Sequence, residues 1–178
     1  AIKGTTQNHL PVEDIKKESC YCVVFVGTVE DSPEAEKFAR GIASIFNLCG
    51  KTSIPETLGL MAESVCFFGY DAGPLHMAVS TGCHTVSVWG PSIYQKWGPP
   101  KTKKHTAIKL DLPCKPCLYG RSPVFPGCPY GRKCLTELDP EVVADAILRQ
   151  SERKKRSSRS SETTFSFPLP CGEPKTTP

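Results

Sequence analysis

Apolar residues gather in short runs along this chain, and amphipathic stretches separate the runs. The runs are CYCVVFV at 20–26, VCFFG at 65–69, HTVSVWG at 84–90 and TAIKLD at 106–111. Continuous apolar runs of this length are typical of strands buried on both faces, and amphipathic segments between them are typical of crossover helices. The pattern therefore predicts an α/β fold with a Rossmann-like parallel sheet flanked by helices.

The intervening segments carry helix signals. Ser32 followed by Pro33 is typical of an N-cap and a first helical residue, and apolar residues then recur at helical spacing as far as Ile45. The remaining elements predicted from caps and spacing are a short strand at 47–49 and helices at 53–62, 74–80 and 140–150.

Length and composition fit one such domain. The chain has 178 residues, 39% of them hydrophobic, which is enough for one modest core. We expect a truncated N-terminal segment at 1–21, one domain at 22–150 and a disordered, basic Ser/Pro-rich tail at 151–178.

Charge gives little information about partners. The run SERKKRSSRS at 151–160 holds five Lys or Arg against one Glu, more than the whole formal excess of +4. The domain itself is therefore near neutral. We expect the run to be a solvated extension and expect no nucleic-acid partner; the alternative is a contact of this run with nucleic acid or anionic lipid. The first nineteen residues lack the apolar run of a signal peptide or membrane span, so we expect a cytoplasmic protein.

The segment GYDAGPLHMA at 69–78 is the most informative turn. A buried strand ends, an acid and a glycine follow, and a helix begins within three residues. In an open parallel sheet, ligands bind beyond the carboxyl ends of strands, where a new helix offers backbone N–H groups and its positive end. The pattern favours a diphosphate site, although Asp71 as a helix cap, Gly73 as a turn residue and His76 as a core histidine would give the same residues.

The longer stretch NLCGKTSIPETLGLMAESVCFFGYDAGPLHMAVSTGCHTVSVWGPS resembles the C-terminal domain of glycosyltransferase family 9, the lipopolysaccharide heptosyltransferases. GKTSI, the amphipathic helix, the DAGPLHMA turn and the strand ending in WGP follow one another as in that family, and PCKPC, CPYG and KCL follow later. The resemblance covers roughly residues 22–150. It implies one half of a GT-B glycosyltransferase, the sugar-nucleotide-binding half only.

What the resemblance implies for function is transfer of an ADP-activated heptose, or a related nucleotide sugar, to a lipopolysaccharide core acceptor. The lipid-linked acceptor would bind through a missing N-terminal domain, at the inner face of the cytoplasmic membrane. Transfer would require no cofactor and no metal at the reaction centre. The residues that match the family's nucleotide-sugar positions are Asp71, Ala72, Gly73, Pro74, Leu75, His76, Thr52 near the nucleobase, and Glu30 or Asp31 at the ribose.

Two departures from the family pattern bear on activity. Ala72 stands where the family has Ser or Thr, so a hydroxyl that could reach the phosphate is missing. The family's catalytic aspartate lies in the acceptor domain, so no catalytic residue is assigned in this chain. The alternative is a non-catalytic nucleotide- or zinc-binding interaction module built on a degenerate GT-B half.

A cysteine loop is expected at 113–135. Cys114 and Cys117 form a CxxC, and Cys128 and Cys134 complete a four-thiol set. Tetrahedral zinc favours such a set, while free thiols and disulfides are the alternatives. Basic neighbours such as Lys115 favour either lowered thiol pKa values or an anionic acceptor, while a solvated loop with no special role would give the same residues.

Overall fold

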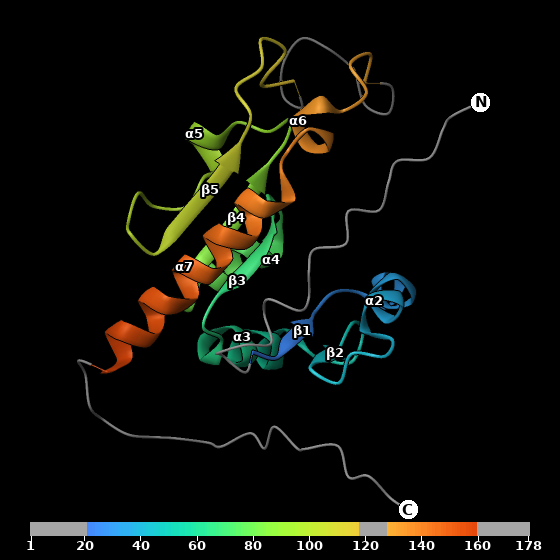
Figure 1. Cartoon of the computed structure of the whole chain (residues 1–178), viewed down its shortest axis with the longest axis vertical. Coiled ribbons are helices and arrows are strands. Elements are labelled where there is room, and N and C mark those ends of the chain that lie inside the picture. The colour runs from blue at the N-terminus through green and yellow to red at the C-terminus, as the bar shows by residue number, and fades with distance from the viewer. Residues whose placement is uncertain (1–20, 118–127, 160–178) are drawn as a thin grey trace, which may run out of the picture. The chain divides into compact units, whose positions relative to one another are not determined.

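The computed structural model describes residues 21–117 and 128–159 (Figure 1). They form two compact units, with residues 21–54 in the first and residues 55–159 in the second. The Rossmann-like α/β class predicted from the sequence is confirmed, because parallel strands alternate with helices in both. The expected single sheet is divided, however, into a two-stranded and a three-stranded sheet, one in each unit.

The first unit is a βαβ arrangement. Strand β1 (Val23–Phe25) leads through the 3₁₀ turn η1 (Val29–Asp31) into helix α2 (Ser32–Ala39), and β2 (Ile45–Asn47) returns parallel to β1. The predicted helix to Ile45 is wrong. It ends at Ala39 because Gly41 adopts the left-handed region (φ +78) and Ile45 joins the sheet. The short strand predicted at 47–49 accordingly lies two residues earlier.

The second unit contains the better-buried sheet. Helix α3 (Ile54–Glu63) precedes β3 (Phe67–Tyr70), α4 (Gly73–Ser80) and β4 (Thr85–Trp89), and the short α5 (Tyr94–Trp97) precedes β5 (His105–Lys109). The strand order is β3-β4-β5, all parallel. Helix α6 (Lys133–Thr136) begins inside the predicted cysteine loop, and the long α7 (Pro140–Arg159) follows.

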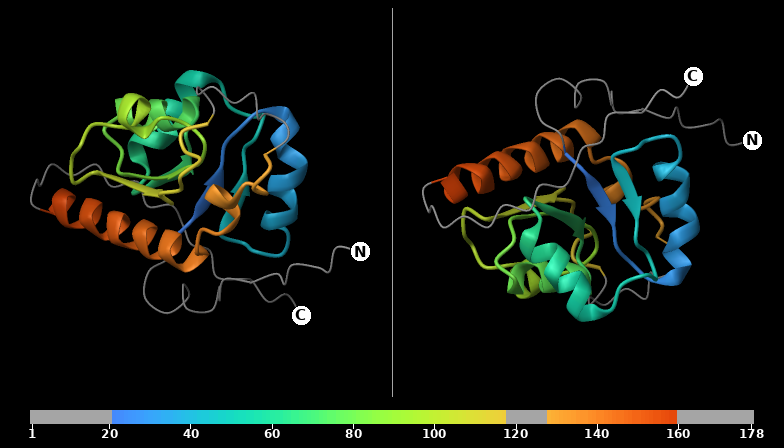
Figure 2. Two further views of the ribbon diagram at one scale, coloured as in Figure 1. Left: turned by 90° about the horizontal axis from the view of Figure 1, so that it is seen from above. Right: turned by 90° about the horizontal axis from the view of Figure 1, so that it is seen from below.

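Every residue of the central strand β4 is buried, because helices cover both faces of this sheet. Figure 2 shows α4 on one face and α7 on the other. Polar side chains on β4 find partners inside: the Trp89 indole N–H donates to Ser87 Oγ at 2.8 Å, and Thr85 Oγ1 lies 3.0 Å from His105 Nδ1. The continuous apolar run HTVSVWG therefore was a correct signal for a strand buried on both faces.

Helix α7 corrects the prediction for the tail. The sequence predicted a helix ending at Gln150 and disorder from 151, but residues 151–159 continue α7. Gln150 and Ser151 are both buried, at 1% and 4% exposure, so the helix is held against the sheet where its sequence turns polar. Residues 160–178 lie outside the described residues, as do residues 1–20. Among the residues that the structure describes, no helix is long and apolar enough to cross a membrane.

Candidate functional site

The turn between β3 and α4 places the predicted diphosphate segment at the carboxyl end of a parallel strand. β3 ends at Tyr70, and α4 begins at Gly73, with Ala72 as its N-cap in an extended conformation (φ −156, ψ 170). Ala72 has only a methyl group, so no side chain caps the first helical turn, and that turn contains no acidic residue. The positive end of the α4 dipole is therefore not neutralised by the helix's own side chains.

His76 and Asp71 lie together at this turn. His76 Nε2 is 3.9 Å from Asp71 Oδ1, and the side chains are 49% and 19% exposed. A half-exposed imidazole is not a core histidine, so the alternative interpretation of His76 is excluded. The pair places one group that can donate beside one that can accept, just after the end of β3.

Gly73 leaves room for a close approach. A Cβ built at this residue would have no atom within 4 Å, so nothing in the chain requires glycine there for packing. Gly73 thereby exposes the backbone at the first residue of α4, where an anion would meet the helix.

Leu75 is the buried member of the predicted set. Its side chain is fully buried, and its backbone N–H donates to Ala72 O at 3.0 Å. Leu75 therefore serves the core and the helix start. Pro74 lacks an N–H and fixes the backbone at the first turn.

The first unit brings together the other predicted nucleotide-binding residues. The Gly50 N–H donates to Gly27 O at 2.9 Å, so the loop after β1 and the loop after β2 lie side by side at the carboxyl ends of the two strands. Glu30 and Asp31 belong to the first loop, and Thr52, which is half-buried, follows the second. The structure thus groups these residues near the carboxyl ends of β1 and β2.

Glu30 and Asp31 have different surroundings. Asp31 Oδ2 accepts both the Thr28 N–H at 2.8 Å and the Thr28 hydroxyl at 3.0 Å, which closes the η1 turn. Glu30 is exposed, and hydrogen bonds from the Thr28 side chain and the Glu30 backbone lower its pKa. Glu30 is therefore the better candidate for the ribose hydroxyls, because Asp31 is committed to the turn.

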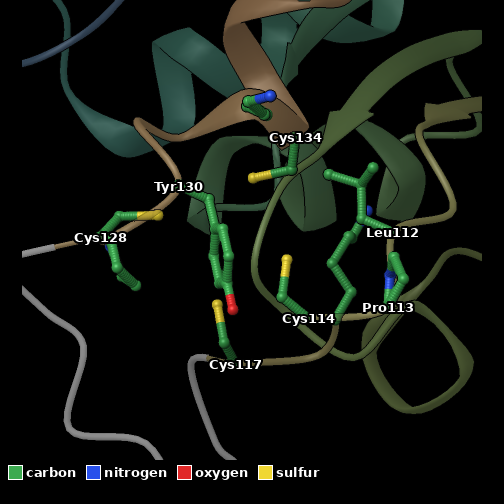
Figure 3. Close-up of a pocket in the computed structure, with 10 residues that line it drawn as sticks. Leu112, Pro113, Cys114, Cys117, Cys128, Tyr130 and Cys134 are labelled. Carbon is green, nitrogen blue, oxygen red and sulfur yellow. The ribbon is translucent and has the colours of Figure 1, made fainter.

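The four cysteines of the loop line one pocket of about 610 Å³ (Figure 3). Their thiols surround the ring of Tyr130. Yet no group of three or more His, Cys, Asp or Glu side chains in the described ranges is placed to hold a metal ion. The structure brings Cys114, Cys117, Cys128 and Cys134 into one pocket but not into a coordination shell, so it does not support the predicted zinc site.

The expected effect of basic neighbours on the thiols is present at Cys134 but is outweighed by burial. Burial raises the pKa of the Cys134 thiol, and the nearby Lys115 ammonium opposes this only in part. Lys115 has a structural role that the sequence did not indicate. Its Nζ donates to Trp89 O at 3.1 Å and to Leu110 O at 2.9 Å, which ties the cysteine loop to the carboxyl ends of β4 and β5.

Comparison with known proteins shows the family and the fold. Residues 8–124 match the model of "Glycosyltransferase family 9 (heptosyltransferase)", which is more than half of the 178 residues. Lipooligosaccharide heptosyltransferase 2 of Campylobacter jejuni (serotype O:6) is 30% identical over 105 residues, 59% of this chain and 32% of that protein. The protein of the same name from Haemophilus influenzae is 28% identical over 95 residues, covering 51% of this chain and 27% of its own length.

Two solved structures share the fold. ADP-heptose lps heptosyltransferase II of E. coli superposes with a TM-score of 0.61 at 20% identity, over 80% of this chain and 40% of that one. The glycosyl transferase family 9 protein of Veillonella parvula also gives 0.61 at 20% identity, over 75% and 37%. The chain thus matches about a third of the length of these curated relatives and about two fifths of these solved chains.

Proposed function

Because this chain belongs to glycosyltransferase family 9, we propose that it binds an ADP-activated heptose, or a related nucleotide sugar, as the donor half of a GT-B glycosyltransferase. The acceptor would be the saccharide core of a lipopolysaccharide, in keeping with the names of the relatives. The observation that carries the proposal is the turn from Asp71 to His76, with its uncapped helix start and half-exposed histidine at the carboxyl end of β3.

Within this proposal the residues have distinct roles. The α4 N-terminus and the bare backbone at Gly73 would receive the diphosphate, and His76 would donate to a phosphate or sugar oxygen. Asp71 is an acceptor and would hold a sugar hydroxyl, since a carboxylate repels phosphate. Glu30 would accept the ribose hydroxyls, and Thr52 would lie by the base. The departing diphosphate would be stabilised without a metal, by the start of α4 and His76.

Calorimetric titration with ADP tests the donor half directly. We expect Gly73→Ala to lower ADP affinity about tenfold, because the added methyl would stand between the backbone and the phosphate, while nothing in the chain opposes it. The control is Gly59→Ala in α3, whose Cβ also meets nothing within 4 Å. This control should leave ADP affinity unchanged. If the folded wild-type protein fails to bind millimolar ADP, the non-catalytic interaction module becomes the better function.

We further propose that the protein works in the cytoplasm at the inner face of the cytoplasmic membrane. The support is the acceptor class: a lipid-linked saccharide is confined to a membrane, so an enzyme that modifies it must meet that surface. Fractionation of cells that express the full chain would test this, with recovery in the membrane pellet at low salt expected.

A further inference from the structure

The segment that leaves the carboxyl end of β4 contains a buried hydroxyl without a hydrogen bond. Ser92 is only 6% exposed, and among the described residues its Oγ is the one buried side-chain oxygen or nitrogen that has no hydrogen-bond partner. Such a group is unfavourable, because it has lost its hydrogen bonds to water and gained none inside the protein. The Ser92 hydroxyl therefore needs a partner that the described residues do not supply.

Helix capping does not explain this serine. A serine just before a helix commonly accepts a hydrogen bond from a backbone N–H in the first turn. The N-cap of α5 is Ile93, however, and no side chain caps that helix. Ser92 thus lies one residue too early for the role that its position in the sequence would suggest.

Contacts with the chain that follows β5 hold the segment around Ser92 in place. The Cys117 N–H donates to Pro91 O at 3.0 Å. A Cβ built at Gly90 would stand 3.0 Å from Leu135 Cδ2, so α6 packs closely against the backbone there. The residues directly before Ser92 are therefore fixed from two sides, and its hydroxyl is positioned before any ligand arrives.

The strand register places Ser92 on the strand next to the proposed diphosphate site. β3 and β4 are parallel neighbours, with Tyr70 beside Val88, and adjacent strands lie about 4.8 Å apart. Gly73 follows Tyr70 by three residues, and Ser92 follows Val88 by four. Both segments therefore leave the sheet at the same end, which is the end where open parallel sheets bind their ligands.

We propose that the Ser92 hydroxyl donates a hydrogen bond to a phosphate oxygen of the bound nucleoside diphosphate. This deepens the donor-half function proposed above and rests on it. Ala72 has only a methyl group, so the turn after β3 offers no hydroxyl of its own at the start of α4. A hydrogen bond to an anionic oxygen is roughly twice as strong as one between neutral groups. It would also give the buried Ser92 oxygen its partner.

The substitution Ser92→Ala tests the proposal with two measurements on one sample. It removes a hydroxyl that has no partner in the ligand-free protein, so the melting temperature without ADP should not fall. ADP affinity, measured by calorimetry, should fall about tenfold, which is the loss of one hydrogen bond to a charged group. Adenosine has no phosphate and should bind the variant and the wild type equally.

The matched control is Ser87→Ala, on the same strand. Ser87 is fully buried, and its Oγ accepts the Trp89 indole N–H at 2.8 Å. Loss of this bond should lower the melting temperature by about 5 °C. ADP affinity should stay unchanged, because Ser87 lies inside β4 and away from the strand end.

A fall in melting temperature for Ser92→Ala as large as that for Ser87→Ala would show that the hydroxyl has a partner within the protein, and would overturn the proposal. Equal losses of ADP and adenosine affinity would also overturn it, since the contact would then not be to phosphate. If Gly73→Ala weakens ADP binding and Ser92→Ala does not, the donor function stands and the role of Ser92 is wrong. If the wild-type protein binds no ADP, both proposals fail.

Discussion

The two ends of the parallel strands in the three-stranded sheet are built differently. We call the end at which the strands begin the amino edge, and the end at which they finish the carboxyl edge. At the amino edge, Gln150 Oε1 accepts from His84 Nδ1 at 2.9 Å, and Gln150 Nε2 donates to Lys103 O at 3.1 Å and to Thr106 Oγ1 at 2.7 Å. At the carboxyl edge, the His76 side chain is half-exposed and the first turn of α4 has no side-chain cap. The first edge uses its polar groups to hold α7 in place, whereas the second is the edge at which we propose that a ligand binds.

This difference indicates which polar residues contribute to stability and which are open to a ligand. A buried polar group must be paired inside the protein, and removing its partner costs more than the hydrogen bond itself. A polar group at an open edge is paired with water and can exchange water for a ligand. Mutations at the amino edge should therefore change the free energy of unfolding. Mutations in the turn from Asp71 to His76, which we call the nucleotide turn, should change the affinity for ADP.

The largest effect is expected for Gln150→Ala. The change removes three hydrogen bonds and leaves the buried His84 without its partner, so we expect a loss of about 3 kcal/mol in the free energy of unfolding. Urea denaturation followed by circular dichroism measures it. The control Gln95→Ala, at an exposed position of α5, should change stability by less than about 0.5 kcal/mol. A similar value for both variants would show that the network does not hold α7.

Lys115→Met should have the next largest effect. The ammonium donates to two backbone carbonyls at the carboxyl ends of β4 and β5, and burial lowers its pKa. We expect a loss of about 2 kcal/mol, since hydrogen bonds from a charged group exceed neutral ones. Lys133→Met on the same loop removes a surface ion pair with Glu137 and should cost less than about 0.5 kcal/mol. Thermal unfolding of both variants checks this. Equal melting temperatures for the two variants would contradict a structural role for Lys115.

Lowering the pH should reduce the free energy of unfolding, through the two histidines at the amino edge. Burial lowers the pKa of both His84 and His105 in the folded protein. The unfolded chain then binds more protons as pH falls below the ordinary histidine value of about 6.5, so folding stability falls with it. We expect a lower urea midpoint at about pH 5.5 than at about pH 8, and a smaller difference in His84→Gln. Stability that stays constant across this range would contradict the buried-histidine account.

The smallest effect on stability, and the clearest on binding, is expected for His76→Ala. Its side chain is half-exposed and its contact with Asp71 is long, so the free energy of unfolding should change by less than about 0.5 kcal/mol. ADP affinity should fall about tenfold, which is one hydrogen bond to a charged group. Calorimetry and thermal unfolding on the same sample compare the two. A large loss of stability with unchanged affinity would mean that this edge is structural too.

The sequence indicated β4 best, because every residue of that strand is buried. HTVSVWG contains β4, whereas VCFFG overlaps β3, whose Phe68 and Tyr70 are exposed. The turn at Asp71 lies where the acid, the glycine and the new helix follow one another in the sequence. Once a helix start is known, the turn on which each later side chain lies follows from its distance along the sequence. This is why His76 was correctly placed in the first turn of α4.

The misses share one cause, which is contact between residues far apart in the chain. Polar composition predicted disorder after Gln150, but the bonds from Gln150 to β5 hold the helix onto the sheet and let it continue to Arg159. Lys115 gave no local signal of its bond to Trp89, 26 residues away. Leu75 fell inside a family motif, yet only packing shows that it points into the core.

The length of α7 has a practical consequence. Twenty residues of helix measure about 30 Å, nearly twice the length of a five-residue strand such as β4. Because α7 runs toward the amino edge, Arg159 leaves the sheet on the side away from Asp71. Immobilising the protein on a sensor chip through a cysteine placed at Arg159 would therefore keep the turn at Asp71 unobstructed and directed toward solution.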